Sequence, residues 1–262
     1  MAIESSVDAP LARPRRHVGK LLVLACVVLW LVYYAPQSPV LKALWQWSPA
    51  LATGFGQNIL ISLVAIGLGS LLGLLVGALA LSPLRLLRLP ARLWVQIFRN
   101  APWLVLIYFT TYVFPFEIHI GSAYVSFPDW VKVTIGLALP ASANVAEIFR
   151  GAIGSIPSTQ WEAARSLAFT RGQIFRSIIL PQCFKRMLPP WMNLYAVITM
   201  GTALASLVGV HDVIDTAQIA SNTVNMTGFT VVIYLSLLVL FFAYCYPISR
   251  LTQHLERRYA FY

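Results

Sequence analysis

The sequence predicts an all-α integral membrane protein with about six transmembrane helices. Charged residues make up only 11% of its 262 residues, whereas soluble domains carry about 25%, and the mean hydropathy is +0.73. The apolar residues come in long uncharged runs, and roughly 20 of them suffice for a helix to cross the hydrocarbon core. Strands of a membrane barrel would instead alternate over about 10 residues, which this sequence does not do.

The distribution of charge orients the chain. The predicted spans are 20–36, 55–81, 97–116, 128–150, 187–210 and 228–249. With the N-terminus in the cytoplasm, 17 of the 19 basic residues lie inside, and only Lys42 and Lys132 lie outside. This asymmetry follows the positive-inside rule. The net charge of +10 therefore sets an orientation with both termini cytoplasmic and does not indicate a nucleic-acid partner.

The N-terminal part precedes the rest of the fold. Residues 1–19 are expected to form a disordered cytoplasmic tail. Residues 20–36 have the charged start and short apolar core of a secretory signal, but no small-residue cleavage site follows. Trp30, Tyr33 and Tyr34 are typical of an aromatic belt at the membrane surface. We expect an uncleaved signal-anchor helix, with a cleaved signal as the alternative.

The second span carries glycines at a spacing of four residues, Gly69, Gly73 and Gly77. Small residues let a neighbouring helix approach closely in lipid. An internal helix contact is the favoured interpretation, and a subunit interface is the alternative. After this span, residues 84–91 are expected to form a short basic turn, with Pro83 and Pro90 ending the helices beside it.

Polar residues inside spans are costly and therefore informative. In the fourth span, Glu147 and Arg150 are three residues apart, so they share a helix face and can form an ion pair. A structural role that fastens the helix to the adjoining loop is favoured. Ser142 and Asn144 lie deeper in the span and are candidates for contact with a polar substrate, beside the alternative that they only stabilise the bundle.

The fifth span contains a second polar stripe, formed by Thr199, Thr202 and Ser206. Thr202 and Ser206 are further candidates for the substrate path. The alternative is structural, because hydroxyl groups often bond to carbonyls of their own helix.

Several chemistries are absent from the sequence. The three cysteines are scattered, the four histidines lack metal-ligand spacing, and no phosphate-binding P-loop occurs. We therefore expect no enzyme activity, metal or cofactor in this chain. If a nucleotide drives the protein, another chain must bind it.

Residues 151–186 form a polar loop on the cytoplasmic side. Within it, Glu162 lies near the start of a predicted helix, where the helix dipole favours an acid. Gly172 permits a bend, and Pro181 is expected to end the second helical stretch. The loop is predicted to form two short helices with a joint. It could lie on the lipid surface or dock into a groove of another protein, which its small-residue face favours.

Four segments resemble those of a known family. EAA at 162–164, followed by Ile178, Leu180 and Pro181, matches the E-A-A-x-x-x-G-x(9)-I-x-L-P loop of ABC-importer permeases, with Ala168 in place of the glycine. FRNAPWL at 98–104 and NVAEIFRGAIGSIPSTQWEAA at 144–164 are similar to segments of the polar amino acid permease family. TALASLVGVHDVIDTAQ at 202–218 resembles the segment that follows in that family.

The resemblance implies a type I ABC importer transmembrane fold (MetI-like) over residues 55–258, after one extra N-terminal helix. It implies a permease subunit of the bacterial inner membrane that forms the path for a polar amino acid or related solute. A periplasmic binding protein would deliver the solute, and a second permease subunit, identical or related, would complete the pore. ATP and Mg²⁺ would be bound by separate cytoplasmic ATPase subunits. The residues implied for contact with the ATPase are Glu162, Ala163, Ala164, Arg165, Ala168 and Gly172.

Departures from the family pattern bear on the joint and on the solute. Ala168 stands at the glycine position, and a left-handed alanine costs roughly 1 kcal/mol, which favours a bend elsewhere. Asn144 replaces a tyrosine, and Met200 and Gly201 replace a usual charged pair.

Two rival functions remain open. A self-contained secondary transporter or channel would place buried charges in its spans for ion coupling, and only Glu147 and Arg150 qualify. A membrane assembly factor that transports nothing would leave the polar stripes unexplained.

Overall fold

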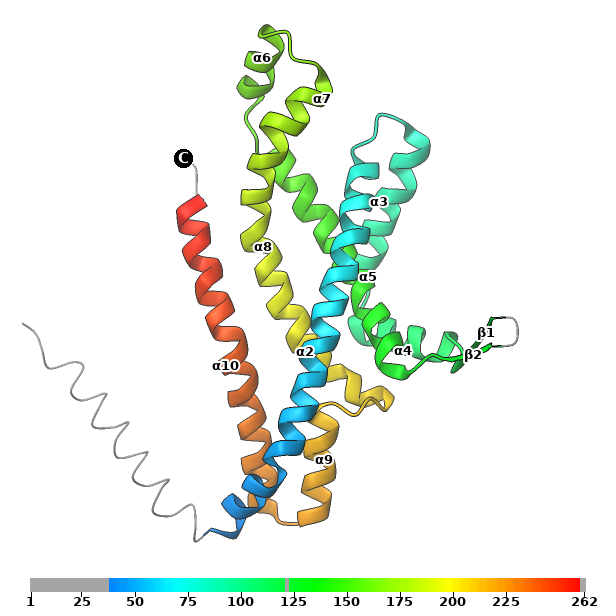
Figure 1. Cartoon of the computed structure of the whole chain (residues 1–262), viewed down its shortest axis with the longest axis vertical. Coiled ribbons are helices and arrows are strands. Elements are labelled where there is room, and N and C mark those ends of the chain that lie inside the picture. The colour runs from blue at the N-terminus through cyan, green and yellow to red at the C-terminus, as the bar shows by residue number, and fades with distance from the viewer. Residues whose placement is uncertain (1–37, 121–122, 260–262) are drawn as a thin grey trace, which may run out of the picture.

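The computed structural model describes residues 38–120 and 123–259, so the predicted tail 1–19 and first span 20–36 lie outside the described residues. The described chain is almost entirely helical, and its longest helices run roughly along the long axis of the molecule (Figure 1). Four segments are long and apolar enough to cross a membrane. They are α2 (Pro39–Ala80), α5 (Asp129–Gly154), the helical segment Arg171–Val208 and α10 (Thr227–Tyr259).

Helix α2 begins at Pro39 and not near residue 55 as predicted. Proline suits the first helical position, where its missing N–H would be unpaired anyway, and the uncharged stretch that follows continues the helix. With 42 residues, α2 is about 63 Å long at 1.5 Å per residue. It therefore exceeds the roughly 30 Å hydrocarbon core and extends beyond it.

The predicted basic turn at 84–91 is wrong. The segment belongs to α3 (Arg85–Asn100), which contains Pro90. A proline in a helix leaves the carbonyl four residues earlier without its usual donor, here that of Leu86, and this residue is 86% exposed. The predicted span 97–116 is interrupted at Ala101 and Pro102, after which α4 (Trp103–Val113) continues the path.

A two-stranded antiparallel β-hairpin, which was not predicted, joins α4 to α5. Strand β1 (Glu117–Ile120) pairs with β2 (Ala123–Ser126), with Glu117 opposite Ser126. Beside it, Lys132 in the first turns of α5 is fully buried. Its Nζ lies 3.0 Å from Asp129 Oδ1 and 3.8 Å from the centre of the Phe116 ring, so this outer charge is neutralised within the protein.

After α5, the chain forms α6 (Ser158–Ser166) and α7 (Arg171–Ile174). A π-helical turn (Phe175–Ile179), α8 (Leu180–Gly201) and a 3₁₀ helix (Thr202–Val208) then follow without a break. Pro181 therefore does not end the pattern as predicted: it lies in the first turn of α8, directly after the π-helical turn, and the helical path continues through it. The chain closes with α9 (Val213–Val224) and α10.

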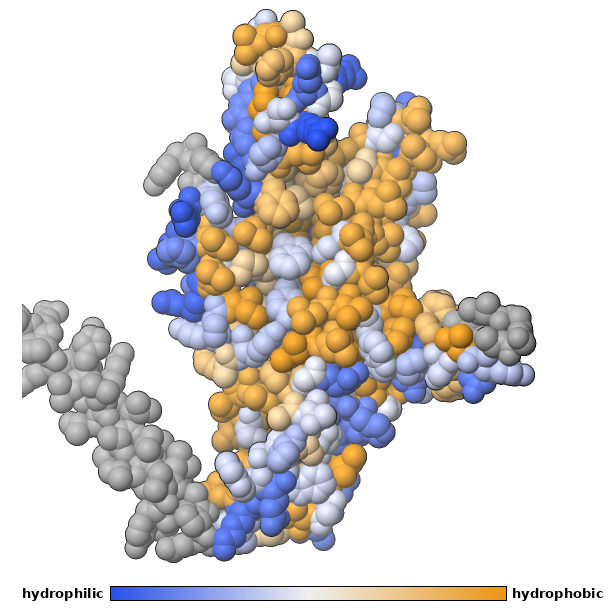
Figure 2. Space-filling model, viewed as in Figure 1, coloured by the Kyte–Doolittle hydropathy of each residue, from blue (hydrophilic) through white to orange (hydrophobic). Residues whose placement is uncertain are grey.

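Hydrophobic side chains cover the middle of the molecule, while hydrophilic ones gather at the end formed by α6 and α7 and near the opposite end (Figure 2). The main core cluster joins α2, α4, α5 and α8 through fully buried residues. Its central members are Ile61, Ile107, Val133, Leu137 and Ile198.

The glycine ladder of α2 packs against α5 within the same chain, as favoured. A Cβ atom on Gly69 would lie 2.5 Å from the Ala141 Cβ, and one on Gly73 would lie 2.5 Å from the Ser142 carbonyl oxygen. Such distances leave no room for a side chain. The two helices therefore touch along their backbones, which is how small residues strengthen helix contacts in lipid.

We expect Gly73→Ala to destabilise the protein by about 1–3 kcal/mol, the usual range for overpacking, because the new methyl group would meet backbone atoms that cannot move aside. Gly67→Ala on the same helix is the matched control, since a Cβ there meets nothing within 4 Å. Thermal unfolding in detergent measures both variants. Equal midpoints for the two variants would contradict the packing described.

Candidate functional site

The α6–α7 hairpin, consisting of α6, the turn 167–170 and α7, projects beyond the ends of α2 and α3 (Figure 1). Its turn is tight. Helix α6 ends where the Phe169 N–H donates to the Ala164 carbonyl and the Ala168 N–H donates to the Arg165 carbonyl. These are the two hydrogen bonds of a Schellman motif, in which Ala168 takes a left-handed φ of 58°. The joint therefore lies at Ala168, and the expectation of a bend elsewhere, at Gly172, is wrong.

Ala168 adopts its left-handed φ, although alanine ordinarily avoids it, because hydrogen bonds fix the end of α6 before it and the start of α7 after it. Thr170 caps α7 in a reciprocal capping box with Gln173, which satisfies donors that a helix start leaves open. Gly172 lies inside the first turn of α7. A favourable cap on each side can outweigh the roughly 1 kcal/mol that a left-handed alanine costs.

We expect Ala168→Gly to stabilise the turn by about 1 kcal/mol, because glycine adopts a positive φ without steric strain. Hydrogen exchange of the Phe169 amide, which is bonded across the turn, measures the local effect, and its opening should become about fivefold rarer. Ala168→Val is the matched opposite, since a β-branched residue tolerates this φ poorly. Unchanged exchange in both variants would contradict the left-handed joint.

The hairpin is anchored to the ends of α5 and α8. At the base of the hairpin, Arg186 Nη1 on α8 donates to the Ser155 carbonyl oxygen at the end of α5 at 2.7 Å and contacts its hydroxyl at 2.8 Å, which ties α5 to α8. Gln182 Nε2 donates to Gln160 Oε1 at 2.7 Å. A small core lies between these contacts, formed by Ala152, Ile156, Ala164, Ile174, Ile179 and Cys183. The hairpin is therefore firmly attached to two membrane helices.

Four of the residues predicted for the ATPase contact lie on α6 (Ser158–Ser166), and they point to two different faces of this helix. Ala164 is buried in the small core, whereas Glu162, Ala163 and Arg165 are exposed. Leu167, at the tip, is 71% exposed, which is unusual for a leucine outside the apolar belt. A hollow of about 550 Å³ lies on the side of the α6–α7 hairpin. It is lined by Trp161, Arg165, Arg171, Gly172, Ile174 and Phe175.

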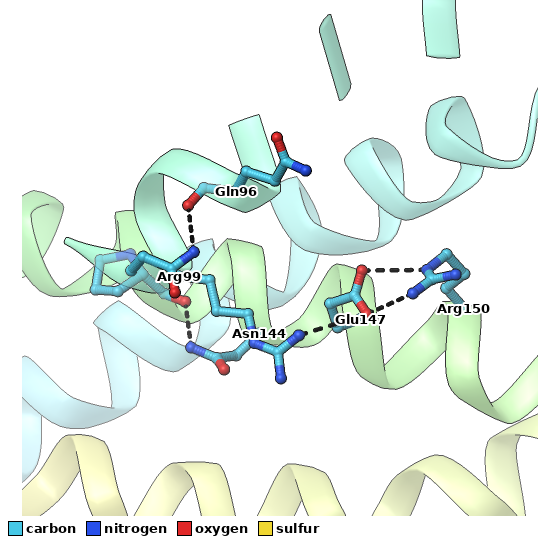
Figure 3. A network of polar contacts seen from close by, with 7 residues as sticks. Gln96, Arg99, Asn144, Glu147 and Arg150 are labelled. Carbon is cyan, nitrogen blue, oxygen red and sulfur yellow. Dashed lines mark hydrogen bonds and ion pairs between the residues drawn. The ribbon is translucent and has the colours of Figure 1, made fainter. Parts of the chain in front are cut away.

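A second cluster lies where α3 meets α5. Glu147 accepts two hydrogen bonds from Arg150, from Nε at 3.1 Å and from Nη2 at 2.7 Å, as the spacing predicted. Arg99 on α3 also approaches, with its Nη1 3.6 Å from Glu147 Oε2. Figure 3 shows the carboxylate between the two guanidinium groups. The ion pair of Glu147 and Arg150 therefore lies within α5. Arg99 links it to α3, and not to the adjoining loop as expected.

Two of the substrate-path candidates are fully buried. The Ser142 hydroxyl accepts from Trp94 Nε1 at 3.0 Å and donates to the Leu139 carbonyl at 2.6 Å. The Thr202 hydroxyl accepts from Asn58 at 3.0 Å and donates to its own helix. Both hydroxyl groups therefore stabilise contacts between elements of this chain.

The other two candidates are partly buried. Asn144 Nδ2 donates to the Pro140 carbonyl at 2.8 Å, and Ser206 Oγ donates to the Ala203 carbonyl at 3.0 Å. Within the described part of the chain, no hydrogen bond joins any two of the four candidates. Their role in the substrate path stays a prediction.

A buried polar cluster, which the sequence reading missed, joins α2, the 3₁₀ helix and α9. Asn58 Nδ2 donates to Thr202 Oγ1 and to Asp212 Oδ2, both at 3.0 Å, and its Oδ1 accepts from the Val213 N–H at 3.0 Å. Asn58 and Asp212 are both fully buried. The signal was present in the sequence, because Asn58 is an amide inside an apolar span, where polar groups are rare and bonded.

Asp212 also caps α9, since its Oδ1 accepts from the Asp215 N–H at 2.9 Å. Burial raises the pKa of its carboxyl above the ordinary value, against the effect of the hydrogen bonds from Asp215 and Asn58. No basic side chain pairs with Asp212 among the ion pairs found in the described ranges. Asn58 is therefore its main side-chain partner.

Known proteins resemble this chain both in sequence and in fold. The family described as "binding-protein-dependent transport system inner membrane component" matches residues 65–261. The "Probable amino-acid ABC transporter permease protein YckA" of Bacillus subtilis (strain 168) is 33% identical over 214 residues, which are 82% of this chain and 91% of that protein.

Two solved structures are similar to the fold. The crystal structure of an amino acid ABC transporter with histidines matches with a TM-score of 0.73 at 25% identity, over 83% of this chain and 97% of that chain. An inward-facing structure of the MetNI methionine ABC transporter matches with a TM-score of 0.57 at 18% identity, over 78% and 95% of the two chains. The second likeness concerns the fold alone.

Proposed function

Because the chain belongs to the family of binding-protein-dependent transport system inner membrane components, we propose how this permease subunit of an ABC importer works and what it carries. The chain has the type I ABC importer fold and is embedded in the membrane. It is a transport subunit and not an enzyme. The solute is a polar amino acid or a related small compound, which the names of its relatives support.

The α6–α7 hairpin is the part that a separate ATPase moves. One observation carries this proposal: the hairpin projects from the bundle, is attached to α5 and α8 through the Gln160–Gln182 hydrogen bond and the small core, and exposes Leu167 at its tip. A rigid projection can transmit a displacement to the membrane helices, whereas a flexible loop cannot. The exposed face of α6 would enter a groove of the ATPase in the helix-in-groove mode, with Glu162 and Arg165 as its charged contacts.

The remaining partners follow from this arrangement. ATP and Mg²⁺ are bound by the ATPase, and a periplasmic binding protein delivers the solute at the opposite end. A second permease subunit, identical or related, completes the pathway. The C-terminal end of α10 lies toward the same end of the molecule as α6 (Figure 1), which supports a cytoplasmic C-terminus in a bacterial inner membrane.

Reconstitution tests the proposal. The chain is co-purified with its associated ATPase and sister subunits, placed in liposomes with the binding protein, and assayed with the twenty standard L-amino acids. We expect uptake of at least one of them that requires ATP and the ATPase. Uptake by the purified chain alone, driven by an ion gradient, would support the rival secondary transporter and contradict the proposal.

A further inference from the structure

Helix α3 has two distinct faces along its length. At 100° per residue, its arginines fall within one narrow arc, and its four most exposed apolar residues fall on another arc about 110° away. The arginines are Arg85, Arg88, Arg92 and Arg99. The four most exposed apolar residues are Leu86, Leu89, Leu93 and Ile97, while the less exposed Leu87 lies outside this arc. The apolar arc suits lipid, and on the arginine arc, to one side of it, Arg99 approaches Glu147 of α5.

Arg99 is the innermost of these arginines along the path into the membrane. It lies in the last turn of α3, just before the break that leads to α4, and inside the predicted span 97–116. Its side chain is 53% exposed and approaches Glu147, which is 25% exposed. An ionisable side chain at this depth ordinarily faces the bundle interior or a water-filled passage.

The charges of this cluster do not balance. Glu147 is already held by two short hydrogen bonds from Arg150, and Arg99 reaches the same carboxylate only at 3.6 Å. Two guanidinium groups thus share one carboxylate, which leaves one positive charge in excess. The Arg99 side chain forms no hydrogen bond with any of the described residues, so its planar fork of donors is available to a ligand.

A guanidinium with free donors is suited to a carboxylate, which it can bind through two parallel hydrogen bonds. Asn144 lies one turn before Glu147 on α5, and Figure 3 shows the Arg99 guanidinium between these two side chains. Among the described residues, the Asn144 side chain makes one hydrogen bond, through its Nδ2, so its carbonyl oxygen can accept from an ammonium group. The two groups together match the two ends of an amino acid.

We propose that Arg99 binds the carboxylate of the transported solute in the half of the pathway nearest the α6–α7 hairpin, with Glu147 holding the guanidinium in place. This inference rests on the proposed function and adds a requirement to it: the solute carries a carboxylate. The excess charge of the cluster is then neutralised while the solute passes. The structural alternative is that Arg99 only fastens α3 to α5.

The test compares an acid with its amide. In the reconstituted complex, the L-amino acid giving the fastest ATP-dependent uptake is compared with its carboxamide. We expect Arg99→Gln to lower uptake of the acid about 10- to 100-fold, the size expected when a hydrogen bond between charged groups is lost, mainly through a higher KM. Uptake of the carboxamide should change less than twofold. Arg99→Lys keeps the charge beside Glu147 but loses the fork, and is expected to be intermediate.

Arg92→Gln is the matched control, because Arg92 lies on the same arc but forms no ion pair with any described residue, and it should leave the ratio of acid to amide uptake unchanged. If Arg99→Gln lowered uptake of acid and amide equally, or Arg99→Lys restored both fully, Arg99 would be a structural fastener and the inference would be overturned. An unchanged ratio of acid to amide uptake in Arg99→Gln, with normal uptake of both compounds, would overturn the inference as well. ATP-dependent uptake of an amino acid by the unaltered complex upholds the proposed function in all these cases, and its absence overturns both.

Discussion

Replacing Glu162 with lysine is expected to lower ATP-coupled uptake at least tenfold while leaving membrane insertion intact. The side chain is exposed on α6, and no ion pair involves it in the described part of the chain. The substitution therefore disturbs no contact within the protein. The ATPase groove that receives the Glu162 carboxylate would meet the positive charge of lysine instead. Like charges across an interface cost several kcal/mol.

Glu256→Lys is the control for this variant, because it makes the same change of charge at an exposed position near the end of α10. The measurements are uptake, ATP hydrolysis stimulated by the binding protein, and recovery of the ATPase with the purified permease. We expect Glu162→Lys to lose stimulated hydrolysis and part of the bound ATPase, and Glu256→Lys to retain both. Normal coupled uptake by Glu162→Lys would refute the role of this residue.

The second large effect is expected at Asn58, where leucine should destabilise the protein by about 3 kcal/mol. Leucine fills a similar volume but removes the hydrogen bonds to Asp212, Thr202 and the Val213 N–H. A buried group that loses its partner carries a desolvation penalty of about 1–3 kcal/mol, and more when it is charged. For a chain of this size the unfolding midpoint should fall by roughly 6–12 °C.

Gln57→Leu is the matched control, since it removes a neighbouring side-chain amide that makes no hydrogen bond with any described residue, and its effect should be small. The double variant Asn58→Leu with Asp212→Asn separates the causes, because a neutral amide no longer leaves a charge unpaired. We expect it to be less destabilised than the sum of the two single variants. Strict additivity would show that Asn58 does not stabilise the Asp212 carboxyl.

The sequence predicted the features that depend on long runs and on fixed spacing. Uncharged runs located α2, α8 and α10, because a bilayer requires about 20 apolar residues wherever a helix crosses, and α5 was located as a mostly apolar stretch although it contains four charged residues. Spacing of four residues predicted the glycine contact, and spacing of three predicted the pair of Glu147 and Arg150. These patterns are local, so one sequence contains them completely.

The failed predictions concern residues whose behaviour depends on distant parts of the chain. Proline was expected to end helices at Pro90 and Pro181. Pro90 instead lies inside α3, one turn after the exposed residue Leu86, and Pro181 lies in the first turn of α8. Alanine was expected to avoid the left-handed joint, yet caps on both sides hold Ala168 there. Arg99 was counted only as a marker of orientation, because its partner lies on another helix, 48 residues away in sequence.

The polar candidates show the same limit. Ser142 and Thr202 were selected as hydroxyl groups inside spans, and the structure uses both for contacts between elements, with Trp94 and with Asn58. Composition alone cannot distinguish a hydroxyl that faces a passage from one that faces a neighbouring helix. Only the arrangement of α2, α3 and α5 around them makes that distinction.

The central claim is that a separate motor protein moves the α6–α7 hairpin, and contact at its tip tests this most directly. A photoreactive amino acid is placed at Leu167 in the assembled complex, and at Leu93 on the apolar arc of α3 as a control. The account predicts that the probe at residue 167 cross-links to the ATPase subunit, while the probe at residue 93 labels lipid. Labelling of lipid alone from both positions would contradict the account.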